Sequence, residues 1–344
     1  MKIESKKRGV GHRSAATLVE VAAQAGVSAV AASVVLNGSR TGTRVSPATR
    51  ERILEAAERL QYSPNALARA LRKQSTDVIA FYDAQNPRLD TRSPFSTAIM
   101  AGIQQGCEEQ KKDLLIHSRV DGHSDEAIFL RLLNGQIDGL ILYARTVTPL
   151  IERLVASRLP VATIVHQVPG VPSVGIDDVQ GGRLLARHLA DKGYRRVLYR
   201  RTEAELPSTL QARFDAFCET ARDCGLTLTH SRNDGFLPDQ AETAMLLASK
   251  GQRPDAVACW NDFSADGIAA FCQARSLRVP ADIAIVGFDG LPSRERPSLQ
   301  LTTIQAPWAD VARTAVEILA SQCAGRTVPS RTVLPVNLLV GQTT

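Results

Sequence analysis

From Asp77 onward the sequence alternates between short runs of apolar, often branched residues and longer stretches with helical periodicity. Continuous apolar runs separated by helices are typical of parallel strands in sheets that are covered on both faces. We expect strands at 78–81, 114–117, 139–143, 161–165, 197–199, 257–260 and 283–288. We expect helices at 95–109, 125–133, 148–156, 182–192, 209–223, 240–250, 263–274 and 309–324. So many strands over about 270 residues fit two doubly wound sheets better than one.

Two such sheets imply two lobes with a cleft between them. In open parallel sheets, ligands lie beyond the carboxyl ends of the strands. Clefts between lobes are also common places for small-molecule sites. The pattern therefore predicts a small-molecule site between the two lobes.

The N-terminal part has a different, all-helical pattern. Apolar residues at i, i+3, i+4 and i+7, starting from Leu18, predict an amphipathic helix. Gly26 is expected to end this helix, and Ser28 to cap a second one over 29–36. Two short helices joined by a tight turn that contains glycine are the pattern of a helix-turn-helix.

A third helix is expected to begin after Ser46, with Pro47 at its first position. Three helices provide a core that is small but sufficient for a DNA-binding head. The Tyr-Ser-Pro-Asn segment 62–65 is expected to end the third helix, because proline disfavours helix in the residue before it. Asn65 is then placed to cap one more short helical stretch over 66–72.

Positive charge is concentrated in this helical part. Residues 1–75 contain 13 Lys and Arg against 5 Asp and Glu, whereas the remainder contains 28 against 30. A basic tail at residues 2–13 accounts for some of the excess, but other basic residues lie within the patterned segments. The asymmetry indicates a module that binds a polyanion, joined to a body of nearly neutral charge.

Short sequence blocks follow one another in a characteristic order. In the head they are Thr17-Leu18-Val19-Glu20-Val21-Ala22, Ala25-Gly26-Val27-Ser28, Val35-Leu36-Asn37-Gly38, Val45-Ser46-Pro47-Ala48-Thr49-Arg50 and Tyr62-Ser63-Pro64-Asn65. In the body they are Ser93-Pro94-Phe95, Gly181-Gly182 with His188-Leu189, Asn261-Asp262, Val286-Gly287-Phe288-Asp289 and Leu301-Thr302-Thr303-Ile304. Over about residues 16–344 the chain resembles the lactose-repressor/galactose-repressor family of bacterial transcription regulators.

The resemblance implies an N-terminal all-α helix-turn-helix head and an α/β two-lobed, periplasmic-binding-protein-like body of two doubly wound parallel sheets. Its expected parts are a basic flexible arm (1–15), the helix-turn-helix domain (16–63), a hinge helix and linker (64–75) and the effector-binding and dimerisation domain (76–344). Within the body, lobe 1 is expected at about 76–176 plus 305–334, and lobe 2 at about 177–304 plus 335–344.

In that family the second helix of the head lies in the DNA major groove. Matching positions make Ala29, Val30 and Val34 the candidate base readers, where many relatives carry hydrogen-bonding side chains. Alanine and valine can contact thymine methyl groups, so recognition is expected to rely also on phosphate contacts and DNA deformation. The expected DNA-binding residues are Thr17, Leu18, Ser28, Ala29, Val30, Ala31, Ser33, Val34, Asn37, Arg40, Arg44, Tyr62, Asn65, Ala68 and Leu71.

Several of these positions have a second interpretation. Ala31, with its neighbour Ala32, could pack into the core of the head. Arg40 and Arg44 lie in a loop about three residues longer than usual in the family, and they either contact phosphates or belong to a solvated loop. Leu71 matches a leucine that wedges into the minor groove, although a lone leucine in a short helix more often packs into a core.

The effector-binding residues implied by the resemblance are Phe95, His166, Arg213, Asn261, Asp289 and Trp308. Arginine 213 matches a residue that grips hydroxyls, carboxylates or phosphates. The two aromatic residues could instead be core, and the asparagine and aspartate could be loop caps. Many sugar-binding relatives have aspartate where this chain has Val165-His166. An acceptor for sugar hydroxyls is lost there, which leaves room for an anionic effector such as a sugar acid beside the neutral sugars.

These features predict a regulator that binds double-stranded operator DNA as a homodimer, with a tetramer as the alternative, under control of a sugar or sugar acid. The alternative is a periplasmic-type sugar-binding protein without a DNA role, but the N-terminus lacks the pattern of an export signal. No apolar run is long enough for a membrane helix, so we expect a cytoplasmic protein. Phosphate-loop, nucleophile-elbow and metal-ligand motifs are missing, so we expect no enzyme activity, cofactor or metal.

Overall fold

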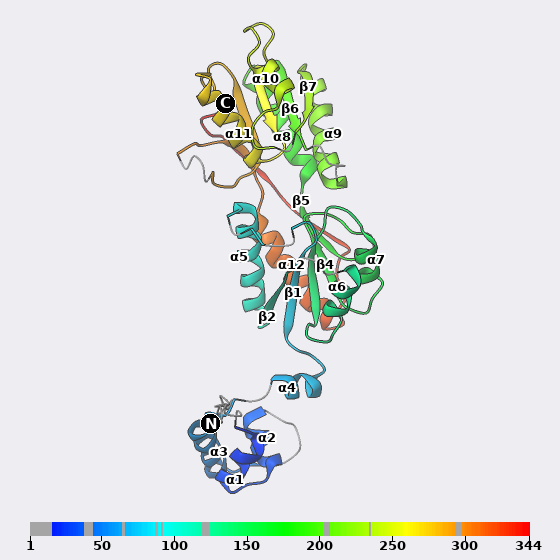
Figure 1. Cartoon of the computed structure of the whole chain (residues 1–344), viewed down its shortest axis with the longest axis vertical. Helices are drawn as coiled ribbons and strands as arrows, with labels where there is room; N and C mark the ends of the chain where they lie inside the picture. The colour runs from blue at the N-terminus through cyan, green and yellow to red at the C-terminus, as the bar shows by residue number, and fades with distance from the viewer. Residues whose placement is uncertain are drawn as a thin grey trace, which may run out of the picture. The chain divides into compact units, whose positions relative to one another are not determined.

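The fold was analysed in a computed structural model. It describes residues 16–37, 44–63, 66–86, 89–90, 92–118, 124–202, 207–233, 235–293 and 298–344. The chain divides into two compact units, Met1–Thr76 and Asp77–Thr344 (Figure 1). The predicted basic arm at 1–15 and the predicted DNA contacts Arg40 and Asn65 lie outside the described residues.

The first unit contains the helix-turn-helix expected from the sequence. Its helices are α1 (Leu18–Ala25), α2 (Ala29–Asn37), α3 (Pro47–Arg59) and α4 (Ala66–Lys73). Thr17 and Glu20 form a capping box at the start of α1, and Gly26 ends that helix with a φ of 63°. Ser46 caps α3 through the backbone N–H of Thr49. The core of this unit consists of Val21, Ala22, Ala25, Ala32, Ile53, Ala56 and Ala57.

The second unit contains two six-stranded sheets. One has the strand order β11-β5-β4-β3-β1-β2 and the other β12-β10-β9-β8-β6-β7. The first holds β1 (Val78–Asp83), β2 (Asp113–His117), β3 (Gly139–Tyr143), β4 (Val161–Ile164), β5 (Ser173–Ile176) and β11 (Arg331–Leu334). The second holds β6 (Arg196–Arg201), β7 (Thr227–Arg232), β8 (Ala256–Cys259), β9 (Ala284–Asp289), β10 (Thr302–Gln305) and β12 (Asn337–Leu339). Neighbouring strands pair in parallel, except that β12 is antiparallel to β10.

Helices connect and cover these strands. They are α5 (Pro94–Glu109), α6 (Asp125–Leu132), α7 (Pro149–Val155), α8 (Asp178–Asp191), α9 (Ser208–Asp223), α10 (Gln240–Leu246), α11 (Asp262–Ala274) and α12 (Trp308–Cys323). We call the first sheet with its helices the β1 lobe and the second the β6 lobe. The chain passes between the lobes after β5, after β10 and after β11. Three crossings bring the carboxyl ends of strands from both lobes to one cleft.

The seven strands and eight helices predicted for the body are present, with shifted ends, and five further strands were not predicted. The unpredicted strands are β5, β7, β10, β11 and β12. Four of them contain only three or four residues, and β7 is a sheet-edge strand that is mostly exposed. Such strands lack the continuous apolar run on which the prediction depends.

Within the described residues, no single helix is long and apolar enough to span a membrane. The pair α1 and α2, bent by 110° between its two helices, meets the length and composition criteria only when the two are taken together.

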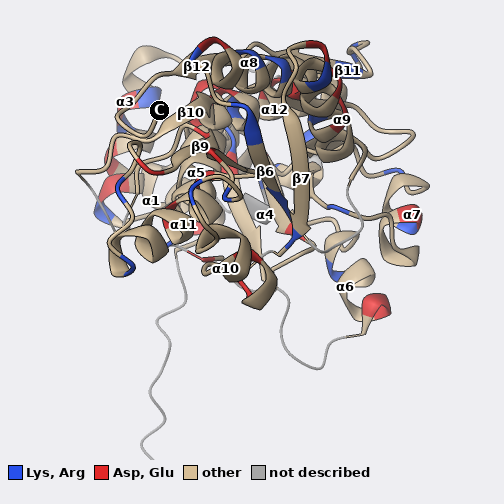
Figure 2. Cartoon of the chain, turned by 90° about the horizontal axis from the view of Figure 1, so that it is seen from above, with Lys and Arg blue, Asp and Glu red and all other residues tan. Residues whose placement is uncertain are grey.

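A buried ion pair connects β6 to α10 in the β6 lobe. β6 carries three arginines, which appear as blue segments in Figure 2. Arg200 is fully buried, and its Nε donates to Glu242 Oε1 of α10 at 3.0 Å. Its Nη2 donates to the backbone oxygens of both Gly235 and Leu237, each at 2.8 Å. These contacts fix the loop that brings Phe236 to the cleft.

Candidate functional site

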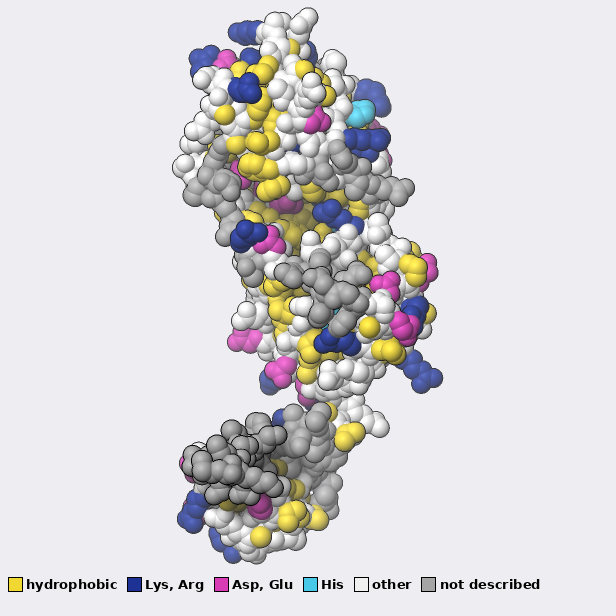
Figure 3. Space-filling model, in the orientation of Figure 1, with side chains coloured by type: hydrophobic (Ala, Val, Ile, Leu, Met, Phe, Trp, Pro, Cys, Tyr) yellow, Lys and Arg dark blue, Asp and Glu magenta, His cyan; other side chains and the backbone are white. Residues whose placement is uncertain are grey.

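A cavity of about 840 Å³ lies between the two lobes of the body. Figure 3 shows the hollow, with hydrophobic and charged side chains in it. Its size falls in the usual range for small-molecule sites. All six predicted effector residues line it: Phe95, His166, Arg213, Asn261, Asp289 and Trp308. The structure thus brings these residues together, and their role in binding stays a prediction.

Strand ends and helix starts place these side chains. Asp289 is the last residue of β9, and His166 lies two residues beyond β4. Asn261 precedes α11, and Trp308 begins α12. Because carboxyl ends of parallel strands share one edge of a sheet, polar side chains from distant parts of the sequence meet there.

An aromatic group forms one wall. The rings of Phe95 and Trp308 lie edge to face, with centroids 5.2 Å apart, and Phe95 also contacts Tyr143 at 5.8 Å. Trp308 is only 3% exposed and belongs to the main hydrophobic core as well as to the cavity lining. The core interpretation and the ligand-facing interpretation of Trp308 are therefore compatible.

His166 is buried and uncharged. Its Nδ1 lies 2.8 Å from Thr209 Oγ1, and its ring stacks on Tyr143 at 5.7 Å. Burial, with the positive charges of Arg145 and Arg213, lowers the pKa of His166 to about 3. A neutral imidazole has one donor and one acceptor nitrogen. His166 can therefore offer a hydroxyl-sized ligand either function, but no positive charge.

Arg213 is already engaged by the protein. Its Nε and Nη2 donate to Asp178 Oδ1 at 2.9 and 2.6 Å, and its Nη1 donates to the Trp260 carbonyl at 2.9 Å. Its guanidinium also stacks on Phe288, 3.3 Å from the ring centroid. Gly182 on α8 makes this possible, since an added Cβ would overlap the backbone oxygen of Arg213. Only the remaining N–H groups of Arg213 are available to a ligand.

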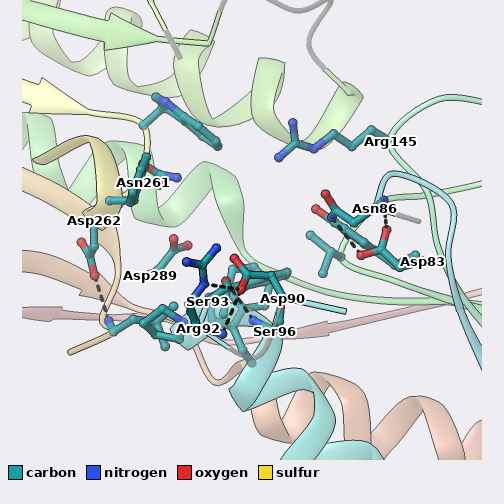
Figure 4. Close-up of a pocket in the computed structure, with 18 of the residues that line it drawn as sticks. Asp83, Asn86, Asp90, Arg92, Ser93, Ser96, Arg145, Asn261, Asp262 and Asp289 are labelled. Atoms are coloured by element: carbon teal, nitrogen blue, oxygen red, sulfur yellow. Dashed lines mark hydrogen bonds and ion pairs between the residues drawn. The ribbon is translucent and has the colours of Figure 1, made fainter. Parts of the chain in front are cut away.

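Asn261 caps a helix and also faces the cavity. Its Oδ1 accepts from the backbone N–H of Ser264 at 2.8 Å, as expected of a cap at the start of α11. Its side-chain nitrogen carries no hydrogen bond within the described residues, and Figure 4 shows it on the cavity side. The two interpretations of Asn261 therefore both apply to the same side chain.

Two carboxyl groups of the cavity have raised pKa values. Burial raises the pKa of Asp289 to about 7, although Arg213 and the Trp308 indole act to lower it. Burial and the negative charge of Asp289 also raise the pKa of Asp262 well above its usual range. Asp262 accepts from Thr303 Oγ1 at 2.6 Å and from the Leu291 backbone N–H at 2.8 Å. Near neutral pH, Asp289 can therefore both donate to and accept from ligand hydroxyls.

The sequence analysis missed other lining residues. Among them are Asp83 at the end of β1, Tyr143 at the end of β3, Arg145 two residues later and Trp260 directly after β8. All four lie at the carboxyl ends of predicted strands. Applying the strand-end rule to every predicted strand would have found them.

The candidate DNA surface is an exposed face of the head. Thr17, Ser28, Ala29 and Arg44 are exposed. Val30 is 52% exposed although it is apolar. The positions Leu18, Ala31, Ser33, Val34, Asn37 and Tyr62 are half-buried. The start of α2 thus offers small and apolar side chains to a partner.

For other positions of the head, burial distinguishes a core residue from an exposed one. Ala32 is fully buried, so it belongs to the core, while its neighbour Ala31 is only half-buried. Leu71 is 83% exposed on α4, and so it is not a core residue of the unit to which it belongs. Ala68 lies on the same helix, without a described side chain.

Both units match known sequence families. Residues 17–65 match the bacterial regulatory proteins of the lacI family, and residues 186–344 match a periplasmic binding protein-like domain. The HTH-type transcriptional repressor PurR of Vibrio vulnificus (strain CMCP6) is 28% identical over 315 residues, which are 88% of this chain and 91% of that protein.

Solved structures share the whole architecture. A lac repressor dimer bound to operator and the anti-inducer ONPF has a TM-score of 0.80 at 24% identity, over 95% of this chain and 98% of that one. The transcriptional regulator CelR in complex with cellobiose has a TM-score of 0.66 at 27% identity, over 96% and 100%. With its lacI-type head and its periplasmic-binding-protein-like body, the chain belongs to the lactose-repressor/galactose-repressor family of bacterial transcription regulators.

Proposed function

We propose that this protein is a transcriptional repressor that binds a specific duplex operator and responds to a small molecule in the cavity between its lobes. One observation carries the proposal. The chain that has a lacI-type helix-turn-helix also has a cavity of about 840 Å³, lined by polar and aromatic side chains from both lobes. A ligand that bridges two lobes favours one arrangement of them over another.

The DNA contact is assigned to the exposed start of α2. Ala29 and Val30 can contact thymine methyl groups in the major groove, where each base pair presents a distinct pattern. Arg44 and the other basic residues of the head supply the contacts with DNA phosphates that contribute to affinity without reading sequence. Because these small side chains form no bidentate contacts, DNA shape and deformation contribute the rest of the specificity.

The ligand is assigned to the polyhydroxylated small molecules, that is, sugars and sugar acids. Asn261, Asp289 and His166 offer donors and acceptors to hydroxyl groups, and the rings of Phe95 and Trp308 offer apolar faces. The relative CelR, solved with cellobiose, supports this class. The same residues contain no nucleophile and base arranged for catalysis, and we propose a binding role without enzyme activity.

The working unit is proposed to be at least a homodimer that acts on the bacterial chromosome, and hence in the cytoplasm. The lac repressor structure that shares this fold is a dimer on its operator. A two-fold dimer maps onto a near-palindromic site with two half-sites. The eight residues of α4 are too few for a stable helix alone in water, so α4 is proposed as the hinge helix that DNA and partner stabilise.

Selection from a random duplex library with the full-length protein tests the proposal. We expect a near-palindromic site to be enriched and its affinity to fall steeply between 50 and 200 mM salt, on the order of 10³-fold, through counterion release. Recovery of unrelated sequences, or equal affinity for any duplex, would contradict it.

A further inference from the structure

One arginine of the cavity has no carboxylate paired with it among the residues that the structure describes. Arg145 lies two residues after β3 in the β1 lobe and is half-buried. Its Nε is enclosed and has no hydrogen-bond partner, and no carboxylate is paired with it among the described residues. Its guanidinium carbon lies 5.9 Å from the centroid of the Trp260 ring, which belongs to the β6 lobe. The side chain therefore reaches across the cleft.

Figure 4 shows where this side chain points. Arg145 extends from the side of the cavity that carries Asp83 and Asn86 toward the side that carries Asn261. Its donors thus face the space that a ligand would fill. The neighbouring phenol of Tyr143 does not balance its charge, because burial raises the pKa of that phenol, an effect larger than the lowering by Arg145.

The other two arginines of the lining differ from Arg145. Arg213 is neutralised by Asp178, with 2.6 Å between Nη2 and Oδ1. Arg92 is largely exposed, and it pairs with Asp90 at 3.5 Å. Arg145 is thus the lining arginine whose charge is left for a ligand, as far as the described residues show.

Two acidic side chains of the lining, Asp83 and Asp262, are engaged by contacts within the protein. Asp83 accepts from the backbone N–H groups of Gln85 and Asn86 at 2.8 and 2.9 Å, and also from the Asn86 side chain. Asp262 is held by Thr303 and by the Leu291 backbone. A cation in a partly closed cavity is favoured when an anion joins it.

We infer that Arg145 binds a carboxylate of the effector, so that the ligand is a sugar acid and not a neutral sugar. The inference rests on the proposed function and narrows its ligand class. A planar guanidinium fits a carboxylate through two parallel hydrogen bonds. A phosphate dianion fits less well, because Arg213 and Arg92 are paired with aspartates and only the single charge of Arg145 is left for a ligand among the described residues. An effector with one negative charge at Arg145 and with hydroxyl groups toward Asn261 and Asp289 matches this distribution of charged and polar side chains.

Calorimetric titration of the full-length protein tests the inference. The probes are gluconate, galactonate, glucuronate and galacturonate, each beside an uncharged counterpart: gluconamide, galactonamide, glucose and galactose. We expect at least one acid to bind at least tenfold more tightly than its counterpart. Arg145→Gln should weaken binding of that acid by about 10- to 150-fold, the usual effect of a charge-assisted hydrogen bond. Affinity for the uncharged counterpart should change by less than about threefold, which also shows that the variant is folded.

Two further variants sharpen the comparison. Arg145→Lys keeps the charge and loses the planar fork, so its affinity for the acid should lie between those of wild type and Arg145→Gln. Arg131→Gln removes an exposed arginine of α6 in the same lobe, outside the cavity lining, and should leave every affinity unchanged.

Three outcomes overturn the assignment. In the first, an acid binds equally well to wild type and to Arg145→Gln. In the second, the uncharged counterparts bind and the acids do not; this outcome leaves regulation by a small molecule intact. In the third, none of the acids binds. Selection of duplex DNA does not involve Arg145, and it therefore tests the DNA part of the proposed function separately.

Discussion

Arg213 of α9 and Asp178, the first residue of α8, form a buried ion pair, with 2.6 Å between Nη2 and Oδ1 and both side chains nearly inaccessible to solvent. Burial raises the pKa of Asp178, and Arg213 opposes that shift. The pair therefore depends on both partners. This geometry gives Arg213 a structural role in addition to any contact with a ligand.

Arg213→Ala is accordingly expected to destabilise the body. Removing one member of a buried pair leaves an uncompensated charge, at a cost of about 3–5 kcal/mol. Arg222→Ala, an exposed position on the same helix, should change stability by less than about 0.5 kcal/mol. Urea denaturation measures both. Equal stability of the two variants would show that the pair contributes nothing, and loss of ligand binding in Arg213→Ala alone does not assign the residue to the ligand.

Two valines of the head should separate DNA recognition from folding. Val30 is 52% exposed on α2, whereas Val21 on α1 is fully buried. Val21→Ala should lower the stability of the head by about 2 kcal/mol through lost burial and a small cavity. Val30→Ala should leave stability within about 0.5 kcal/mol and weaken binding to the selected operator. Thermal unfolding and operator titration of both variants check this, and an unchanged operator affinity in folded Val30→Ala argues against base contact by α2.

Leu71 should matter for DNA and not for folding. Its 83% exposure leaves little stability to lose, so Leu71→Ala should unfold at nearly the wild-type temperature. If the side chain wedges between base steps, its truncation should weaken operator binding by about tenfold or more. Leu54→Ala is the matched control, because Leu54 is also exposed, but on α3. The same operator affinity for the two variants would remove Leu71 from the interface.

Asp289 should make the body less stable as pH rises. Its pKa is about 7 in the folded chain against an ordinary 3.8, so between these values the folded state holds a proton that the unfolded state has released. Stability therefore falls with rising pH across this window. Asp289→Asn removes the effect, and its stability advantage over wild type should be larger at pH 8 than at pH 5. A difference that does not change with pH contradicts the raised pKa.

The sequence predicted the architecture because the features that carry it are local. Gly26 ends α1, Ser46 caps α3, and continuous apolar runs mark the central strands of both sheets. The short strand β11 and the exposed edge strand β7 were missed, because their existence depends on pairing with distant strands. Register and edge pairing are tertiary properties that periodicity does not encode.

The sequence predicted which of these residues lie at the cavity, but it did not predict their hydrogen-bond partners. The resemblance placed Arg213 and Asn261 at the cleft, and the structure adds that one is paired with Asp178 and the other caps α11. A pairing between residues 35 apart in sequence has no local signal. Arg145 was missed because the strand-end rule was not applied to the strand that precedes it, and its significance comes from a counter-charge that the described residues do not supply.

The central claim is that occupation of the cavity controls DNA binding, and one titration tests it most directly. The full-length protein is titrated against its selected duplex by fluorescence anisotropy at fixed salt, without and with saturating ligand whose binding has been established by calorimetry. We predict that the ligand changes operator affinity by about 5- to 150-fold, the usual range of coupling between two sites. Thermodynamic linkage requires that the duplex change ligand affinity by the same factor. An operator affinity that is the same with and without bound ligand would contradict the account.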